Sequence, residues 1–449
     1  MSFLRGLLQS RSHLAFLVGL GGALASATWL DHAMGSEPKM AQTGVKLTSL
    51  GGPTGPALKQ TGVPLTDQER AWAKTAWRYF ENNYQPATGF VNSVDGYASA
   101  TLWDLGSYMM GLIAAHELGI VDAGTFDARL DKLLASLESL SLVDGIAPNK
   151  AYDTISLAMV DYDRTPKPNG IGWSAIDVAR LAVPLTLVVW KYPTRTDRVR
   201  AIVDRFHLDQ LVAGGQLIGS RRTPAGALER TQEGRFGYEQ YAAKSFFLFG
   251  QDVGIAIRYD VDVARKKVSG QEILYDARLP RDNDGTHNAV LSEPYVLEGV
   301  EHGLDATTLP LARGVFLAQK NRWSQTGILT AASEDNLDQA PYFVYGSVLN
   351  DDKPWAAFSP DGKDASAFRS ASLKAGFGWG YLFDDPYAAE LVGKLGPQSN
   401  PDKGFYSGLY ESNGKPNFAM TANTNGIVLE ILLYRAKGPI LRNARKVTP

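Results

Sequence analysis

Two kinds of helical segment alternate along this chain, and the alternation limits the possible folds more than any other feature. Segments 102–118, 176–190 and 238–249 are apolar on nearly every side, which is typical of helices buried all round. Segments 125–140 and 196–211 carry one apolar stripe beside charged residues, which is typical of half-exposed helices. An inner ring of buried helices inside an outer ring would give this order. The pattern predicts an all-α (α/α)6 toroid or barrel.

The first helix of the folded region is expected to begin after Thr66, because Thr66-Asp67-Gln68-Glu69 is a capping-box sequence. Apolar residues at helical spacing predict about eleven helices in all. Those not yet named lie at 288–302, 307–322, 371–383, 386–395 and 425–436. A small β-hairpin is predicted from Val261 to Tyr275. Long loops, which often carry function, are expected at 141–172, 213–235 and 396–422.

The N-terminal segment predicts export. Arg5 and Arg11 precede an uncharged apolar stretch that contains the signal-peptidase pattern Ala25-Ser26-Ala27. Residues 1–30 are therefore expected to be a signal peptide, or an inner-membrane anchor formed by residues 14–30. Residues 31–64, rich in Gly, Pro, Thr and Lys, are expected to be a flexible linker, and residues 65–449 the catalytic domain. The bulk of the chain would then be periplasmic or exported.

Composition narrows the chemistry. The chain has no cysteine, which excludes disulfides, thiolate metal sites and a cysteine nucleophile. Its six histidines are scattered, so no metal site is expected. A net charge of -2 without a long basic run argues against nucleic acid as a partner. Gly376, Gly378 and Gly380 lack the full dinucleotide-binding spacing, so no cofactor is expected.

Carboxylates recur beside aromatic, amide or hydroxyl residues at predicted helix starts and in connecting loops. The segments are Trp103-Asp104, Tyr238-Glu239-Gln240-Tyr241, Ser292-Glu293-Pro294-Tyr295, Ser333-Glu334-Asp335-Asn336 and Tyr410-Glu411-Ser412-Asn413. Aromatic rings cover the apolar faces of sugar rings, polar groups bind sugar hydroxyls, and paired carboxyls can break a glycosidic bond. The pattern predicts a glycoside hydrolase.

Glu239 is predicted to be the general acid, because burial beside its flanking tyrosines would raise its pKa. The second catalytic carboxylate is predicted to be Asp104 or Glu334, with Asp335 and Glu411 behind them. A structural role for Asp104 is equally open, since Thr101-Leu102-Trp103-Asp104 also fits a capping box. An inverting mechanism is favoured by analogy with other (α/α)6 hydrolases.

Other side chains of these segments are predicted to bind substrate. They are Trp103, Tyr238, Tyr241, Glu293, Asp335, Tyr410, Glu411 and Asn425. Asn425 is included because Asn423-Thr424-Asn425 opens the last predicted helix, and N-capping accounts for only one of the two asparagines. Asp177 and Arg180, three residues apart on one helix, are predicted to form an ion pair.

Several segments together resemble a bacterial family of exported proteins labelled as a domain of unknown function. They are Thr101–Asp104, Gly237–Tyr241, Leu291–Tyr295, Ser333–Asp335, Tyr410-Glu411 and Thr421–Gly426. The resemblance covers about Leu65 to Gly438. That family is distantly similar to glucoamylase-like domains and to (α/α)6-barrel endo-β-1,2-glucanases. The resemblance implies an (α/α)6 barrel and glycan processing, and assigns no catalytic role to any single residue.

Three functions stay open at this point. The first is a glycoside hydrolase acting on a β-glucan or a related bacterial exopolysaccharide. The second is a polysaccharide lyase on the same fold, in which Tyr238, Tyr241 or His287 would abstract a proton in a basic cleft. The third is a non-catalytic glycan-binding component of an envelope polysaccharide system. All three have an oligo- or polysaccharide as the partner.

Overall fold

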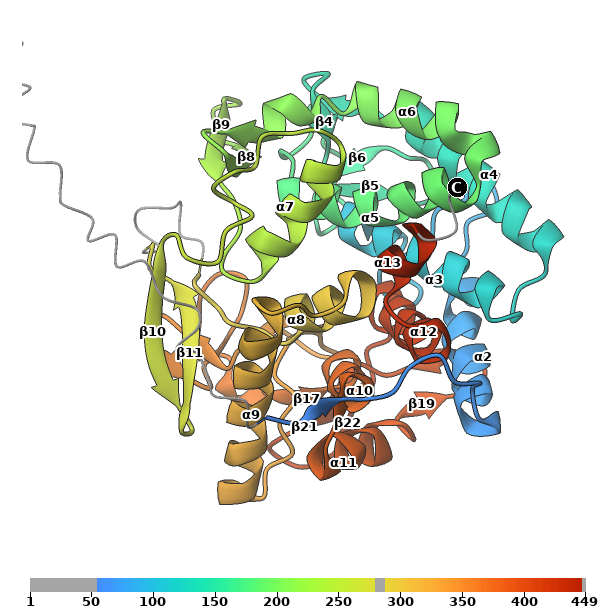
Figure 1. Cartoon of the computed structure of the whole chain (residues 1–449). Helices are drawn as coiled ribbons and strands as arrows, with labels where there is room; N and C mark the ends of the chain where they lie inside the picture. Colours follow the sequence, from blue (N-terminus) through green and yellow to red (C-terminus); the bar gives the residue numbers. More distant parts are fainter. Residues whose placement is uncertain (1–54, 279–286, 446–449) are drawn as a thin grey trace, which may run out of the picture. The chain divides into compact units, whose positions relative to one another are not determined.

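A computed structural model describes residues 55–278 and 287–445. Six largely buried helices form the interior of this part of the chain (Figure 1). They are α3 (Leu102–Glu117), α5 (Ala175–Lys191), α7 (Tyr238–Leu248), α8 (Glu293–Leu297), α10 (Leu373–Leu382) and α12 (Ala422–Lys437). Each contacts the next in chain order, and α12 contacts α3, so the contacts run in a cycle. The segments predicted to be buried all round therefore lie inside.

Half-exposed helices pack outside this interior set. They are α2 (Asp67–Asn82), α4 (Ala123–Ser139), α6 (Thr196–Arg205), α9 (Thr308–Thr326) and α11 (Pro386–Leu395). Each packs mainly on one inner helix: α2 on α12, α4 on α3, α6 on α5, α9 on α8, and α11 on α10; α2 also contacts α3. In α4 the leucine stripe is buried as predicted. The capping box of Thr66 and Glu69 at the start of α2 is also confirmed.

Between α7 and α8 the chain forms a hairpin, not a helix. Its strands are β10 (Val263–Val268) and β11 (Gln271–Asp276), and β11 packs on α9. This confirms the hairpin predicted from Val261 to Tyr275. The inner helix α8 continues as a π-helix, η5 (Glu298–His302), and the short helix α13 (Ile440–Arg445) packs against η5 and α5.

Short strands are more numerous than an all-α prediction allows. Several precede inner helices or lie in the loops between them: β2 (Ser99–Thr101), β12 (Glu334–Asn336), β13 (Phe343–Gly346), β17 (Ser370–Ser372), β21 (Gly408–Tyr410) and β22 (Pro416–Asn417). They pair in small antiparallel sheets, such as β12 with β13 and β17 with β21. Partly buried loops need partners for their backbone groups, and short ladders supply them. The description of the fold as all-α is corrected accordingly.

The end of the predicted linker belongs to the folded part. Strand β1 (Ala57–Leu58) pairs with β18 (Phe383–Asp384), and the amide of Gly62 donates to the carbonyl of Arg435 at 3.1 Å. The predicted signal peptide or anchor, 1–30, lies outside the described residues. Within the described residues, the structure contains no helix with both the length and the apolar character needed to cross a membrane.

A buried ion cluster lies among the inner helices. Arg180 pairs with Glu301 and, at 2.5 Å, with Glu430, and all three side chains are 0% exposed. The predicted Asp177–Arg180 pair is therefore wrong. Spacing placed the two residues on neighbouring parts of α5, but the two interior glutamates draw Arg180 away from the helix start.

Candidate functional site

The first residues of the inner helices meet at one end of the helical assembly. Trp103 belongs to α3, Tyr238 to α7, Glu293 to α8, Lys374 to α10 and Asn423 to α12, and all lie in the first two positions of their helices. Helix N-termini carry partial positive charge, which favours carboxylates nearby. This end of the assembly gathers the acids described next, which we call the acid cluster: Asp104, Glu293, Glu334 and Asp335.

Glu293 is the hub of the acid cluster and is 1% exposed. Its Oε1 accepts from the indole N–H of Trp103 at 3.2 Å and from the amide Nδ2 of Asn423 at 2.9 Å. Its Oε2 forms an ion pair with Lys374, which is itself 4% exposed. Glu293 thus joins three inner helices to α8, and its environment is closed rather than open.

Asp335 lies on the other side of Lys374. Its Oδ1 is 4.0 Å from Lys374 Nζ and accepts from the Ser372 hydroxyl at 3.1 Å. The side chain is buried, and burial raises the pKa of Asp335 to about 7 although the charge of Lys374 opposes the shift.

Glu334 precedes Asp335 in strand β12 and, unlike Asp335, is partly exposed. The hydroxyl of Tyr238 donates to its Oε1 at 2.8 Å. Burial, reinforced by the charge of Glu293, raises the pKa of Glu334 to about 7. At neutral pH this side chain is therefore protonated in a large fraction of molecules, which a general acid requires.

Asp104 lies in the first turn of α3, next to the N-cap of that helix. Thr101 is the N-cap of α3, and its hydroxyl accepts from the Asp104 amide at 3.1 Å and donates to Asp104 Oδ2 at 2.7 Å. Burial raises the pKa of Asp104, and the charges of Lys374 and Glu293 also act on it. The side chain is only half-buried, and the capping box is incomplete, because the Thr101 amide donates to the Ser93 hydroxyl at 3.3 Å and not to Asp104.

Two acids that sequence reasoning did not place in the site lie beside Asp104. Burial raises the pKa of Asp177 well above its ordinary value, and the charges of Glu233 and Asp104 add to the shift. Glu233 accepts from the Ser174 hydroxyl and from the Ala175 amide, both at 2.6 Å. The sequence signal was Asp177 at the start of an apolar helix, the same context that singled out Asp104.

Trp103 and Tyr238, both predicted to bind substrate, lie beside Glu293 and Glu334. Their rings pack edge to face with centroids 5.5 Å apart. Lys374 and Asn423 were missed. Lys374 lies in a predicted helix of apolar and glycine residues, and a lone lysine there gave no signal; Asn423 was passed over in favour of Asn425.

Glu239, the predicted general acid, is placed elsewhere. One of its oxygens accepts from Gln232 Nε2 at 2.9 Å, and the other forms an ion pair with Arg278, which also pairs with Asp276. Burial raises the pKa of Glu239 while Arg278 lowers it. Adjacent residues point in different directions here: Tyr238 toward the acid cluster, and Glu239 toward Arg278. The general-acid assignment to Glu239 is withdrawn.

Four residues predicted to bind substrate have internal partners instead. Tyr241 donates to Glu301 at 2.8 Å, and Tyr410 donates to Asp338 at 2.6 Å. Glu411 accepts from both terminal nitrogens of Arg322, at 2.6 and 2.7 Å. Asn425 Oδ1 accepts from the Phe405 amide at 2.8 Å. All four are at most about a tenth exposed, and their polar groups are bonded within the fold.

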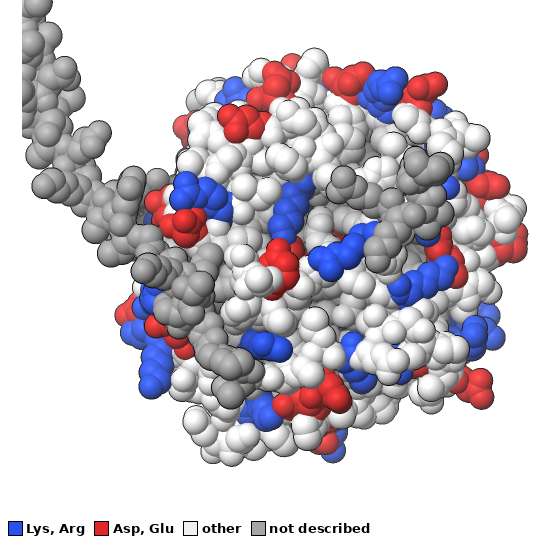
Figure 2. Space-filling view, in the orientation of Figure 1, with Lys and Arg blue, Asp and Glu red and all other residues white. Residues whose placement is uncertain are grey.

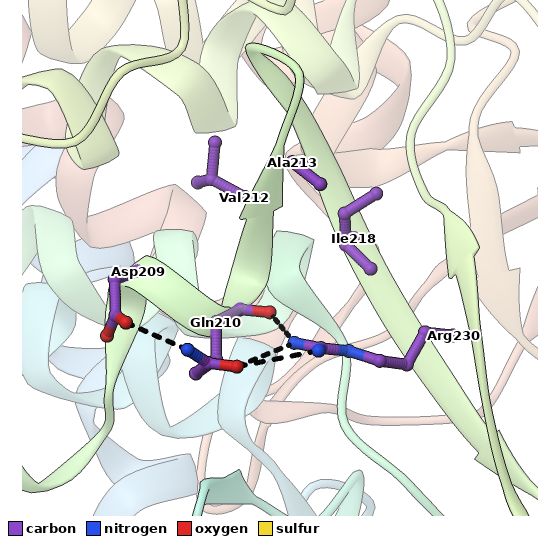
Figure 3. A pocket seen from close by; sticks show the side chains of 6 residues that line it. All are labelled: Asp209, Gln210, Val212, Ala213, Ile218 and Arg230. Atoms are coloured by element: carbon purple, nitrogen blue, oxygen red, sulfur yellow. Dashed lines mark hydrogen bonds between the residues drawn. The ribbon is translucent and has the colours of Figure 1, made fainter.

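Two cavities lie outside the acid cluster. Figure 3 shows one of them, in which Arg230 donates to Gln210 and Gln210 donates to Asp209. Its only acid is exposed and already bonded, so it offers no carboxyl pair. Across the described ranges, acids and histidines do not gather in any group suited to a metal ion.

Solved structures show what this fold resembles. A provisionally named glucoamylase from Bacteroides caccae is 14% identical, with 84% of this chain and 95% of that chain covered and a TM-score of 0.59. An endo-β-1,2-glucanase from Chitinophaga pinensis is 11% identical, with 85% and 95% covered and a TM-score of 0.57. A β-1,2-glucanase from Parabacteroides distasonis is 10% identical, with 86% and 60% covered and a TM-score of 0.56. The chain shares the helical-barrel fold of these proteins.

Sequence comparison gives the family. No curated protein matches this chain. Residues 71–438 match the family described as "Protein of unknown function (DUF3131)". Because the match spans most of the 449 residues, the chain belongs to the DUF3131 family.

Proposed function

We propose that this protein is a glycoside hydrolase with an (α/α)6 toroid, acting on a β-glucan or a related bacterial exopolysaccharide. The observation that carries the proposal is Glu334, a partly exposed carboxyl with a pKa of about 7 among further carboxyls. The cyclic contacts of the six inner helices support the toroid. The similar structures support a glucan, since one is a complex of an endo-β-1,2-glucanase with sophorotriose and glucose.

In this mechanism Glu334 is the general acid. It gives its proton to the glycosidic oxygen as the bond from that oxygen to C1 breaks. The Tyr238 hydroxyl, which donates to Oε1, leaves Oε2 to carry the proton. Asp104 is the proposed base: it takes a proton from the water that attacks C1, so both products end in hydroxyl groups. Attack by water from the opposite face inverts the anomeric centre.

The remaining acids of the cluster hold the site in place. Glu293 and Asp335 flank the buried cation Lys374. Burial and the charge of Glu293 together keep the proton on Glu334, the partly exposed member of the cluster.

The lyase alternative is disfavoured by two observations. Burial and the charges of Glu293 and Glu334 raise the pKa of Tyr238 well above its ordinary value, so Tyr238 is a poor base. A lyase also needs cations to neutralise a uronate carboxylate, whereas the acid cluster surrounds one lysine.

The test is reducing-end release from β-1,2-, β-1,3- and β-1,4-glucans by the Glu334→Gln variant. Loss of a general acid is expected to lower the rate by about 10²–10⁴-fold. Glu239→Gln is the matched control and should keep activity near that of wild type. Full activity in Glu334→Gln would refute the assignment of the acid. Glycan binding by wild type without any turnover would favour a non-catalytic component.

We also propose that residues 1–30 export the protein or anchor it in the inner membrane, from the basic and apolar pattern of that segment. Fractionation of cells that produce the full chain tests this: recovery in the cytoplasm would contradict it.

A further inference from the structure

Four exposed aromatic side chains lie on loops around the acid cluster. Tyr97 is 37% exposed, Tyr162 59%, Tyr342 66% and Phe418 54%. We call these four residues the aromatic rim. Large apolar side chains gathered at one end of a soluble protein mark a binding surface more often than chance exposure does.

Hydrogen bonds between the loops place the rim residues in order. The Tyr97 hydroxyl donates to the Tyr162 carbonyl at 2.9 Å. The amide of Asp95 donates to the carbonyl of Met420 at 3.0 Å, which sets the loop of Tyr97 beside that of Phe418. In space, the loop of Tyr97 therefore lies between the loop of Tyr162 and the loop of Phe418.

The same order continues to Tyr342. The amide of Phe418 donates to Asp338 Oδ2 at 3.0 Å, and the amide of Leu337 donates to the Tyr342 carbonyl at 2.9 Å. Phe418 thus lies beside the turn that carries Tyr342. That residue has a backbone φ of 65°, a left-handed conformation that is uncommon for a bulky side chain. The turn holds this ring outward in solvent rather than in the core.

The rim borders the acid cluster on two sides. Thr421, three residues after Phe418, caps α12, whose Asn423 binds Glu293. Three residues after Tyr342, Tyr345 pairs with Glu334 across strands β12 and β13.

Beyond these two sides, Tyr162 lies near Asp177 and Glu233, the acids that the sequence did not place in the site. Burial of the hydroxyl end and then the charges of Asp177 and Tyr345 raise the pKa of Tyr162 well above its ordinary value, although the residue as a whole is 59% exposed; its hydroxyl therefore faces those groups. The aromatic rim therefore runs from Asp177 past Asn423 to Glu334.

We propose that the aromatic rim binds the sugar rings of an uncharged glycan chain that crosses the acid cluster. This deepens the proposed function and rests on it. Aromatic faces pack on the apolar faces of pyranose rings, and neighbouring carboxylates accept from sugar hydroxyls. The acids here outnumber the nearby cations Lys374 and Lys150, so the carboxyls that are ionised would repel a chain of uronates or phosphates at close range. The excess of acidic residues at this site therefore favours a neutral glycan over an anionic one.

The experiment measures binding apart from turnover. The Glu334→Gln variant of the full chain is run in native gels that contain a neutral β-1,2- or β-1,3-glucan, or polygalacturonate as an anionic probe. In that background, Tyr162→Ala, Tyr342→Ala and Phe418→Ala are each expected to weaken neutral-glucan binding by about three- to tenfold. Phe247→Ala is the control, since Phe247 is 63% exposed near the C-terminal end of α7, away from the rim.

The outcomes separate this proposal from the hydrolase proposal. Unchanged binding of neutral glucan in all three rim variants would overturn the proposal that the aromatic rim binds the glycan, even if Glu334→Gln abolishes turnover. Preference for polygalacturonate over every neutral glucan, or no binding to any neutral glucan, also overturns it. If the rim variants weaken binding but the wild-type protein shows no turnover, the proposal for the rim stands and the proposed hydrolase function is rejected. Melting temperatures equal to that of the parent variant exclude misfolding as the cause of lost binding.

Discussion

Glu334 and Asp335 are neighbours in sequence but have different surroundings. In a strand, successive side chains point to opposite faces. Glu334 meets Tyr238 and keeps part of its surface in solvent, whereas Asp335 turns toward Ser372 and Lys374 in the interior. Both have a pKa of about 7, because both are desolvated among other acids. Of the two, only Glu334 combines that pKa with exposure to solvent.

The pKa of Glu334 predicts the pH dependence of activity. A general acid must be protonated, and its proton is present below the pKa and lost above it. Activity, measured as kcat/KM, is expected to fall as pH rises through about 7. This fall forms the alkaline limb of the plot of kcat/KM against pH. Because Asp335 titrates in the same range, the limb reports an apparent pKa of the pair Glu334 and Asp335.

Tyr238→Phe sharpens this prediction. The Tyr238 hydroxyl stabilises the ionised form of Glu334 and so lowers its pKa. Its loss should move the alkaline limb of kcat/KM to higher pH, while Tyr275→Phe, a change on the distant hairpin, should leave the limb in place. A limb that moves to lower pH in Tyr238→Phe would contradict the assignment.

The positive charge of the buried Lys374 offsets the cost of burying the carboxyls of Glu293 and Asp335. Lys374→Met would leave Glu293 and Asp335 buried without it, and we expect the free energy of unfolding at pH 8 to fall by about 3 kcal/mol. The variant raises the folded-state pKa of Asp335 further, so the loss should shrink as pH falls and the carboxyl takes up its proton. Urea unfolding at pH 8 and pH 5.5 measures both.

The matched control is Lys363→Met. The side chain of Lys363 is 81% exposed, and its ion pair with Asp361 is open to water. Its removal should change stability by no more than about 0.5 kcal/mol. Equal losses in Lys374→Met at the two pH values would show that packing, rather than charge, dominates at that position.

At the scale of elements, the three glycines of α10 have a packing role. A Cβ on Gly376 would overlap Leu395, one on Gly380 would overlap Val392, and one on Gly378 would overlap Val296. The first two contacts are with the outer helix α11 and the third with the inner helix α8. The glycines allow α10 to approach both neighbours closely, and this approach positions Lys374 beside Glu293.

Gly378→Ala is expected to destabilise the protein by about 1–3 kcal/mol, because the added methyl group overpacks the contact of α10 with Val296. Gly393→Ala in α11 is the matched comparison. A Cβ there meets nothing within 4 Å, so alanine should stabilise the helix by about 0.5–1 kcal/mol. Thermal unfolding of the two variants measures the difference. Stabilisation by both substitutions would show that α10 and α8 are more loosely packed than the structure indicates.

The sequence predicted the helices and part of the site, for a physical reason. Periodicity depends on burial along one helix, so it identified α3 and α4 as different kinds of helix before any contact was known. A second pattern, carboxylates beside aromatic, amide or hydroxyl residues, singled out Glu293 and Glu334. The direction of a side chain at a helix start depends on neighbours far along the chain, which is why Glu239 was assigned wrongly and Lys374 was missed.

At the scale of the molecule, the site exists only because distant segments meet. Trp103 and Asn423, 320 residues apart, contact each other beside Glu293. On the opposite end, where α13 follows α12, basic and acidic side chains are interspersed on the surface (Figure 2). Among the described residues seen in this view, neither sign forms one continuous patch (Figure 2).

The segment before α2 ties two of the inner helices together. The amide of Lys59 donates to the Leu382 carbonyl and its Nζ to the Gly380 carbonyl, both at 2.9 Å, at the end of α10. The amides of Gly62 and Val63 both donate to the carbonyl of Arg435 in α12, at 3.1 and 3.5 Å. Residues 57–63 thus bridge α10 and α12, which both supply side chains to the acid cluster.

A chain that begins at residue 65 should therefore be less stable than one that begins at residue 55. Each lost hydrogen bond contributes about 1 kcal/mol, and the loss of this bridge is expected to lower the melting temperature by about 2–5 °C. Because α10 and α12 carry Lys374 and Asn423, glucan hydrolysis should also be lost at a lower temperature in the shorter chain. Equal melting temperatures, or activity lost at the same temperature, would show that the cycle of inner helices holds the site without this bridge.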